Sequence, residues 1–385
     1  MQQPLFTPSC PPISVNAATP FVNAVTPVST TNTLPSASFA TRLLAWWDQH
    51  GRHDLPWQVG RNPYRVWLSE VMLQQTQVTT VIPYFLRFLE QFPTLEQLAH
   101  ACEDEVLAQW SGLGYYSRGR NLHKTAQRLM AEYQGQLPDD PELLNQLPGI
   151  GESTANAIVS QAFDRVLPIL DGNVKRVMAR HAAIAGWSGQ SRVQKQLWQA
   201  ATERLPDQRG ADYTQAIMDL GATVCKSRQP QCQHCPVQQD CSARLSDRVG
   251  EFPGRKPKKA LPQKTGAFLL LTNAQQELLL HKRPGQGIWA GLWCLPQWDD
   301  EQALQGELAP FEWAQSRYSW ARFEHRFTHY QLNAEVWRIS LDQHSHQLIG
   351  VGEHQQRWLS AQACLALGLP QPIRRLLEAF HQQLA

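Results

Sequence analysis

The spacing of apolar residues divides the chain into a helical first part and a second part that contains strands. From residue 39 to about residue 243, apolar residues recur every three or four positions, as in Phe39, Leu43 and Trp47, and this period is that of an amphipathic helix. Glycines and prolines between residues 112 and 149 interrupt the pattern and divide it into short helices. We therefore predict an all-α N-terminal domain.

After residue 264 the apolar period shortens towards two, which is typical of strands. Ala267–Thr272 and Glu277–Lys282 have the pattern of two hairpin strands, and residues 330–337 indicate a further strand. Helical spacing returns near the C-terminus, where Ile373, Leu376 and Phe380 predict a terminal helix. The second domain is therefore predicted to be α+β.

Two segments of unusual composition delimit these domains. Residues 1–38 precede the first charged side chain, Arg42, and seven prolines occur before it, so we predict a disordered tail. Residues 248–264 carry six basic residues, one acid and three prolines, which predicts an extended linker. Its charge either contacts a phosphate backbone or is simply solvated. The predicted domains therefore span residues 39–247 and 265–385.

Composition excludes several classes of protein. Apolar residues make up 42% of the 385 residues, enough for a buried core, and no run of about 18 apolar residues predicts a membrane span. The formal net charge of +2 does not by itself indicate a nucleic-acid partner, although it can hide a basic face. The N-terminus lacks the features of a secretory signal, so we expect a reducing cytoplasmic setting rather than a disulfide framework.

Four of the eight cysteines have the spacing of a metal site. Cys225, Cys232, Cys235 and Cys241 form the pattern C-x6-C-x2-C-x5-C. This spacing is compatible with a tetrahedral zinc ion and equally with an iron–sulfur cluster. Lys226, Arg228 and Arg244 surround these cysteines in the sequence, so the site could present a basic loop to DNA.

Two further motifs precede the cysteines. Leu147–Gly151 (LPGIG) lies between helical stretches, and Gly149 and Gly151 would leave amide groups free to bind a phosphate at the start of the next helix. The alternative is an ordinary connection between two helices. Asp171 follows about twenty residues later, where it would suit the N-cap of a helix as well as a catalytic role.

Taken in order, these motifs resemble the endonuclease III superfamily of helix–hairpin–helix DNA base-excision glycosylases. The resemblance is closest to its adenine DNA glycosylase (MutY) branch and runs from about Phe39 to the C-terminus. It is carried by LSEVMLQQTQV at 68–78, GLGYY at 112–116, LPGIGEST at 147–154, LDGNVKRV at 170–177 and the cysteine pattern. It implies one [4Fe–4S] cluster on the four cysteines.

The resemblance also implies a catalytic set. Excision of adenine breaks the C1′–N9 bond, which requires a proton for the leaving base and negative charge beside the cationic sugar, as in glycoside hydrolysis. Glu70 lies in an apolar segment, where burial would raise its pKa and keep it protonated. The family match implies that Glu70 protonates N7 and later helps to activate water. It likewise implies that Asp171 stabilises the sugar and that Asn173 helps to position the site.

The resemblance also implies residues that contact DNA. Lyase-type relatives have a lysine where this chain has Ser153, and an alcohol cannot form an imine, so we expect a monofunctional glycosylase. A base must leave the duplex to reach a buried acid. The resemblance implies wedge residues beside the estranged base (Gln75, Leu113 and Tyr115) and residues lining the adenine pocket (Trp57, Leu73 and Gln215), although Leu113 and Trp57 would otherwise be assigned to the core.

The C-terminal domain resembles a Nudix fold without its catalytic box. The segment after Pro296, QWDDEQAL, lacks the expected Glu-rich pattern that binds Mg²⁺, so we expect a binding module. Phe327, Thr328 and His329 match the family's loop that recognises 8-oxoguanine, with Thr in place of Ser. Without the family, this triplet is no more than a turn between strands.

Together these features predict an enzyme that binds double-stranded DNA with A:8-oxoguanine or A:G mispairs. We expect a monomer with no membrane association, located in a bacterial cytoplasm at the nucleoid. Two alternatives remain: a pyrimidine glycosylase/lyase like endonuclease III, which Ser153 and the C-terminal domain oppose, and a non-catalytic iron–sulfur protein that senses redox state on DNA.

Overall fold

The computed structural model describes residues 37–257, 260–341 and 355–384. The expected disordered tail lies almost wholly outside the described residues, as do two residues of the expected linker. None of the described helices is both long and apolar enough to cross a membrane.

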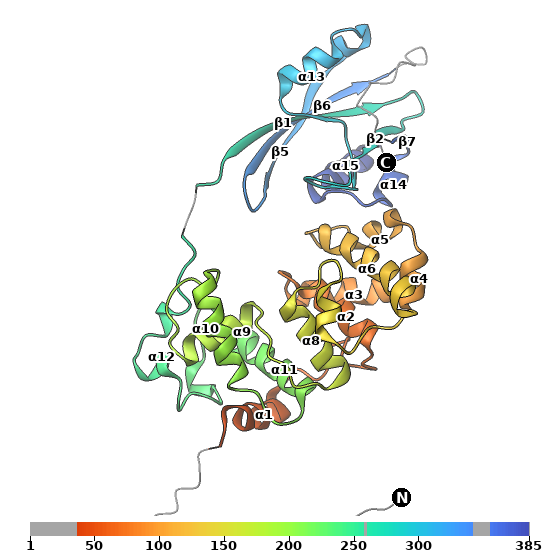
Figure 1. Ribbon diagram of the computed structural model, residues 1–385. Coiled ribbons are helices and arrows are strands. Elements are labelled where there is room, and N and C mark those ends of the chain that lie inside the picture. The colour runs from red at the N-terminus through yellow and green to blue at the C-terminus, as the bar shows by residue number, and fades with distance from the viewer. Residues whose placement is uncertain (1–36, 258–259, 342–354, 385) are drawn as a thin grey trace, which may run out of the picture. The chain divides into compact units, whose positions relative to one another are not determined.

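The first part of the chain is all helical, as predicted (Figure 1). Its α-helices are α1 (Phe39–His50), α2 (Pro63–Leu73), α3 (Val78–Gln91), α4 (Leu95–His100), α5 (Glu103–Trp110), α6 (Ser117–Tyr133), α7 (Pro141–Asn145), α8 (Glu152–Phe163), α9 (Gly172–His181), α10 (Ser191–Thr202), α11 (Gly210–Asp219) and α12 (Ser242–Leu245). A π-helical turn, η1 (Leu220–Val224), extends α11, and short 3₁₀ turns lie at η2 (Cys232–His234) and η3 (Val249–Glu251).

The second part is a mixed sheet with helices, which confirms the α+β prediction (Figure 1). Its elements are β1 (Gln263–Thr272), β2 (Leu278–Lys282), β3 (Trp293–Cys294), β4 (Gln297–Trp298), α13 (Glu301–Leu308), η4 (Glu312–Ser316), β5 (Tyr318–Arg326), β6 (Gln331–Ser340), β7 (Gln356–Leu359), α14 (Ala361–Leu365) and α15 (Gln371–Leu384). The main strand order is β3-β2-β1-β6-β5, with β4 paired to β1 and β7 to β2.

The expected hairpin is present, and β1 is the central strand. Thr272 in β1 pairs with Leu278 in β2, antiparallel, and β1 also runs parallel to β6 along its whole length. Seven consecutive residues at the end of β1 are buried, because neighbours cover both faces of a central strand. Apolar side chains on one face pack with α13 in a cluster of their own.

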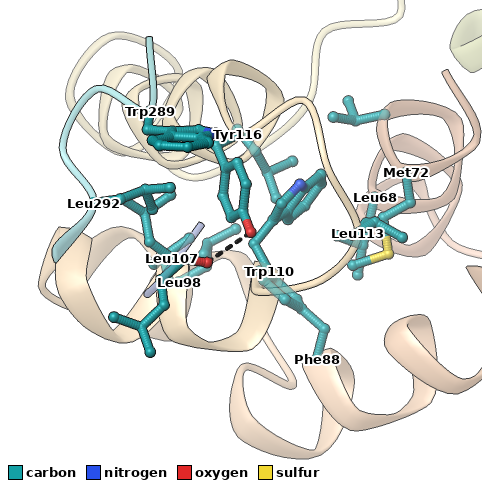
Figure 2. Packing of buried hydrophobic residues seen from close by; sticks show 14 of the residues in the cluster. Leu68, Met72, Phe88, Leu98, Leu107, Trp110, Leu113, Tyr116, Trp289 and Leu292 are labelled. Carbon is teal, nitrogen blue, oxygen red and sulfur yellow. Dashed lines mark hydrogen bonds between the residues drawn. The ribbon is translucent and has the colours of Figure 1, made fainter. Parts of the chain in front are cut away.

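Large apolar side chains hold the helices together. The fully buried Trp67, Trp110, Phe85 and Phe88 belong to one cluster, while α1, α9, α10 and α11 share a second. The first cluster continues into the C-terminal domain, where Trp289 and Leu292 lie near Leu107 and Tyr116 (Figure 2). The hydroxyl of Tyr116 donates to the carbonyl of Leu369 at 2.8 Å. The expected linker is also partly packed, since Phe252 is buried and its carbonyl accepts a hydrogen bond from Arg180.

Helix α2 is fixed at both ends. At its start the side chain of Asn62 accepts a hydrogen bond from the amide of Arg65, and Pro63 occupies the first turn, where a missing N–H costs little. At its end the buried guanidinium of Arg118 donates to the carbonyls of Val71, Met72 and Gln74. These carbonyls have no partner within the helix, so Arg118 satisfies the last turn of α2, which follows directly after Glu70.

We expect Arg118→Met to lower the free energy of unfolding by about 2–4 kcal/mol, because buried carbonyls lose a charged donor. Urea denaturation followed by tryptophan fluorescence and by circular dichroism would measure the change. Arg128→Met on the same helix is the control, since Arg128 makes a solvent-accessible i,i+4 pair with Glu132 and its loss should change stability little. Equal effects of the two substitutions would contradict this account of the end of α2.

Candidate active site

A cavity of about 680 Å³ lies among α2, the start of α3, α9, α11 and the loop after α1. Seven of the residues that the sequence indicated line it: Trp57, Glu70, Leu73, Gln75, Asp171, Asn173 and Gln215. Residues separated by up to 158 positions therefore share one cavity, because α2, α8 and α11 pack together. Arg52, Arg176 and Lys226 also line it; of these cations only Lys226 was indicated by the sequence, as part of the basic cysteine loop.

Glu70 is held in this cavity as a weakly acidic carboxyl. It lies one turn from the end of α2, and its Oε1 accepts a hydrogen bond from Nε2 of Gln161 at 2.6 Å. The pKa of Glu70 is raised to about 7: burial is the main cause, the Gln161 donor acts in the opposite direction, and the nearby charge of Asp171 contributes to the rise. Burial has this effect because an ionised carboxylate loses hydration that apolar neighbours cannot replace. Glu70 is therefore substantially protonated near neutral pH.

Asp171 is both a helix cap and a cavity residue, so the two interpretations of this position are not exclusive. Its Oδ1 accepts a hydrogen bond from the amide of Val174 at 2.7 Å, and its Oδ2 accepts one from Nδ2 of Asn173 at 3.3 Å. Burial raises the pKa of Asp171, and the donors at the start of α9 oppose this shift. The N-terminus of α9 thus stabilises the anion at a fixed position on the cavity wall.

Asn173 is held in turn by Arg176. The guanidinium of Arg176 donates to Oδ1 of Asn173 at 2.9 Å and to the carbonyls of Gly221 and Cys225 at 2.6 and 2.7 Å. With its acceptor oxygen occupied, the amide of Asn173 directs its Nδ2 group to Asp171. A continuous set of hydrogen bonds therefore joins the cysteine loop to the aspartate.

Asp219 anchors another wall of the cavity. Its carboxylate is fully buried and accepts hydrogen bonds from Nε1 of Trp47, from the backbone and side chain of Arg52, and from Nε2 of Gln215. The shortest joins Arg52 and Asp219 at 2.6 Å. A buried carboxylate is tolerated when donors of this kind surround it. Asp219 thereby fixes two cavity residues from different segments.

The four cysteines meet at one small pocket. Cys225, Cys232, Cys235 and Cys241 line it together with Arg180 and Arg244. Within the described residues, no group of three or more His, Cys, Asp or Glu side chains is arranged to hold a metal ion. A tetrahedral zinc gathers four thiolates around a single ion at about 2.3 Å, whereas a cluster distributes them over several iron atoms. Four cysteines around a shared pocket are donors that either an iron–sulfur cluster or a zinc ion accepts.

The glycine hairpin connects α7 to α8 as expected. Gly149 has φ +79°, and a Cβ there would lie 2.8 Å from the Cβ of Asn121. Gly151 is the N-cap of α8, where no side chain caps the helix, and a Cβ on it would meet no other atom within 4 Å. The first amides of α8 therefore have no side-chain cap.

The predicted wedge residues differ in exposure. Tyr115 is 46% exposed and, like Gln75, has a positive φ. Leu113 is only 6% exposed and lies near Leu68 and Met72 in the core (Figure 2), so its placement fits the core alternative. Ser153 does not line the cavity, and its Oγ accepts a hydrogen bond from the amide of Leu170 at 2.8 Å.

Phe327, Thr328 and His329 form the turn between β5 and β6. The amide of Phe327 donates to the carbonyl of Tyr330 at 2.9 Å, and Thr328 and His329 are exposed. The ring of Phe327 lies 5.4 Å from that of Trp289 and 4.5 Å from that of His325. The turn that the sequence alone would indicate is therefore present, and aromatic packing fixes its base.

Comparison with known proteins identifies both domains. Residues 68–203 match the model of the HhH-GPD superfamily base excision DNA repair proteins, and residues 267–379 match the NUDIX domain. An all-α domain with a glycine hairpin, a carboxylate-lined cavity and a four-cysteine pocket thus places the chain in the class of base-excision DNA repair glycosylases.

Two adenine DNA glycosylases, one bacterial and one mammalian, identify the family. An adenine DNA glycosylase of Buchnera aphidicola is 35% identical over 350 residues, which cover 90% of this chain and 98% of that protein. The rat adenine DNA glycosylase is 36% identical over 79% of this chain and 71% of its own. A solved thermostable thymine-DNA glycosylase is 26% identical, with a TM-score of 0.48, over 54% of this chain and 95% of its own. The chain belongs to the adenine DNA glycosylase family.

We expect Gly149→Ala to lower the free energy of unfolding by about 1–2 kcal/mol, because a Cβ strains the left-handed backbone and meets Asn121. Gly151→Ala is the matched control, since Gly151 has a negative φ and open space around it. Thermal unfolding of the two variants measures the difference. If both variants melt together, the hairpin does not require glycine at position 149.

Proposed function

We propose that the protein flips adenine out of A:8-oxoguanine and A:G mispairs and removes it by hydrolysis, with Glu70 as the general acid and Asp171 as the anion beside the sugar. The observation that carries this proposal is the cavity that the two carboxyl groups share. Glu70, with a pKa of about 7, comes from α2, and Asp171 is the N-cap of α9. Removal of such adenines would prevent G:C to T:A transversions.

The two carboxyl groups have complementary tasks in the proposed reaction. The proton of Glu70 passes to N7 of the flipped adenine, and the C1′–N9 bond then breaks with its electron pair leaving on the base. The resulting oxocarbenium-like sugar is stabilised by the negative charge of Asp171. Glu70, now ionised, accepts a proton from the water whose oxygen bonds to C1′. Asn173 keeps Asp171 in place through its amide.

Several features support the proposed recognition of DNA. The uncapped start of α8 and the glycine hairpin suit a phosphate contact that is independent of sequence. Gln75, which lines the cavity, and Tyr115, which lines an adjoining pocket together with Gln75, are exposed and suit a wedge, and the family match assigns Leu113 to the same wedge. Phe327, Thr328 and His329 would contact 8-oxoguanine from the C-terminal domain, which acts in this proposal as a binding module. We propose that the enzyme works as a monomer on double-stranded DNA.

We also propose that the four cysteines hold a [4Fe–4S] cluster. When bound, such a cluster would hold the cysteine loop rigid. The loop would be positively charged, since Arg180 and Arg244 line its pocket and Lys226 lines the neighbouring cavity. Arg180 donates to Sγ of Cys225 at 3.3 Å, which suits a ligand thiolate. The cluster's role in this proposal is structural.

The substrate assignment is tested with duplexes that carry A, T, C or G opposite 8-oxoguanine. We expect release of adenine only, and slower release when guanine replaces 8-oxoguanine. Borohydride should not trap a covalent enzyme–DNA adduct efficiently, because Ser153 cannot form an imine. Efficient trapping, or release of a pyrimidine, would favour the lyase alternative.

The acid is tested with Glu70→Gln, which keeps the size of the side chain but cannot donate the acidic proton. We expect DNA binding to persist and excision to fall by at least about 100-fold, the usual contribution of general acid–base catalysis. Glu96→Gln, on the exposed surface of α4, should excise like the parent enzyme. Unchanged turnover in Glu70→Gln would refute the assignment and would favour a non-catalytic role.

The pH dependence follows from the raised pKa of Glu70. The general acid is competent when protonated, so kcat/KM should be constant well below pH 7 and fall about tenfold per pH unit above it. Excision rates measured with substrate well below KM, between pH 5 and pH 9, follow this limb. A rate that stays flat across neutral pH would contradict the proposed acid.

A further inference from the structure

Gln161 is buried at the end of α8 and reaches across to α2. Only 3% of this residue is exposed, and it is not one of the residues that line the cavity. Its Nε2 nevertheless lies 2.6 Å from Oε1 of Glu70. A buried amide is thus in direct contact with the carboxyl group of the proposed acid while remaining out of reach of a base in the cavity.

This contact distinguishes the two oxygens of Glu70. Oε1 accepts the amide N–H, whereas Oε2 accepts no hydrogen bond from the described residues. Because Glu70 lines the cavity, Oε2 is the oxygen left available to a bound ligand. The two oxygens of a free carboxyl group are equivalent, so the asymmetry comes from Gln161.

The asymmetry also decides where the proton of neutral Glu70 resides. If Oε1 carried the proton and pointed it along the existing contact, its hydrogen would face the hydrogen of the Gln161 amide. The arrangement in which Oε1 is the carbonyl-type acceptor and Oε2 carries the O–H avoids this conflict. The proton is then on the oxygen that a ligand can reach.

We propose that Gln161 is a positioning residue that orients the carboxyl group of Glu70 and assigns its proton to Oε2, ready for transfer to the flipped base. This inference rests on the proposed role of Glu70 as the acid. Gln161 itself does not touch the reacting atoms. It acts by restricting the rotation of the Glu70 carboxyl, so that fewer bound complexes have the proton turned away from adenine.

The reverse orientation of the Gln161 amide predicts the opposite shift of the Glu70 pKa, so the direction of the shift distinguishes the two orientations. If Oε1 of Gln161 faced Glu70, the glutamic acid would donate its proton to Gln161, and the contact would stabilise the neutral form. With Nε2 facing Glu70, the contact stabilises the ionised form. If Nε2 faces Glu70, as proposed, removing the amide raises the pKa of Glu70. If Oε1 of Gln161 faces Glu70, removing the amide lowers that pKa.

Gln161→Met provides the test, because methionine has a similar length and no amide. Ser160→Ala is the matched control: Ser160 is the preceding residue on α8, is fully buried, and its Oγ has no hydrogen-bond partner among the described residues. Circular dichroism and thermal melts establish that both variants are folded. If Gln161→Met does not fold, Gln161→Asn replaces it, since the shorter amide cannot keep the 2.6 Å contact.

Two readouts follow, one with DNA and one without. For Gln161→Met we expect single-turnover excision at pH 6 to fall roughly tenfold, with the affinity for an A:8-oxoguanine duplex unchanged and the alkaline limb displaced to higher pH. In the DNA-free protein, the carboxyl of Glu70, assigned by the signal lost in Glu70→Gln, should titrate at a higher pH by isotope-edited infrared spectroscopy. Ser160→Ala should leave every quantity as in the parent.

The outcomes separate this inference from the proposed function. A downward shift of the Glu70 titration in Gln161→Met, or no shift, would overturn the proposed donor. An upward shift with an unchanged rate at pH 6 would overturn the positioning role. If Glu70→Gln still excises adenine, the function proposed for Glu70 fails, and the infrared titration continues to report whether Gln161 donates to it.

Discussion

The burial of one carboxyl group against a second helix is the interaction on which the rest of the site depends. In the proposed reaction Glu70 acts as the acid near neutral pH only if its environment keeps it protonated, and burial is the main cause of its raised pKa. Burial alone would leave the carboxyl free to rotate and without any partner. The amide of Gln161 supplies one hydrogen bond and leaves the other oxygen for the cavity.

Asp171 lines the same cavity as Glu70, and its charge is stabilised in a different way. Asp171 begins α9, so the helix supplies the amide hydrogen bonds that stabilise its charge. Asn173 and Arg176 then connect it to the loop of the four cysteines. Desolvation is the largest influence on both carboxyls and raises the pKa of each, but several donors at the start of α9 oppose it at Asp171, whereas only the amide of Gln161 opposes it at Glu70.

The helices and strands could be predicted from the sequence because the physical signals for them are local. Helical and alternating periodicity depends on residues a few positions apart, and the glycine hairpin and the Asp171 cap are local as well. The gathering of Trp57, Glu70, Asp171 and Gln215 came from the resemblance to a family and not from periodicity. Leu113, which the family match assigns to the wedge, is only 6% exposed in this structure, and its role as a wedge stays a prediction.

What the sequence did not predict are side chains whose partners lie far along the chain. Gln161 contacts a residue 91 positions away, and Asp219 contacts Arg52 over 167 positions. In the sequence, Arg118 is one of several basic residues on a helix; only the fold brings its guanidinium to the carbonyls at the end of α2. Nothing in the local pattern of a glutamine, an aspartate or an arginine distinguishes these positions from solvated ones, because their roles are set by tertiary packing.

The central claim is that the side chains at positions 70 and 171 act on the same nucleotide. The most direct measurement is a crystal structure of the inactive Glu70→Gln enzyme bound to a duplex with adenine opposite 8-oxoguanine. The account predicts an extruded adenosine with its N7 beside residue 70 and its C1′ beside the carboxylate of Asp171. An adenosine that remains stacked in the duplex, or that reaches only one of these two side chains, would contradict it.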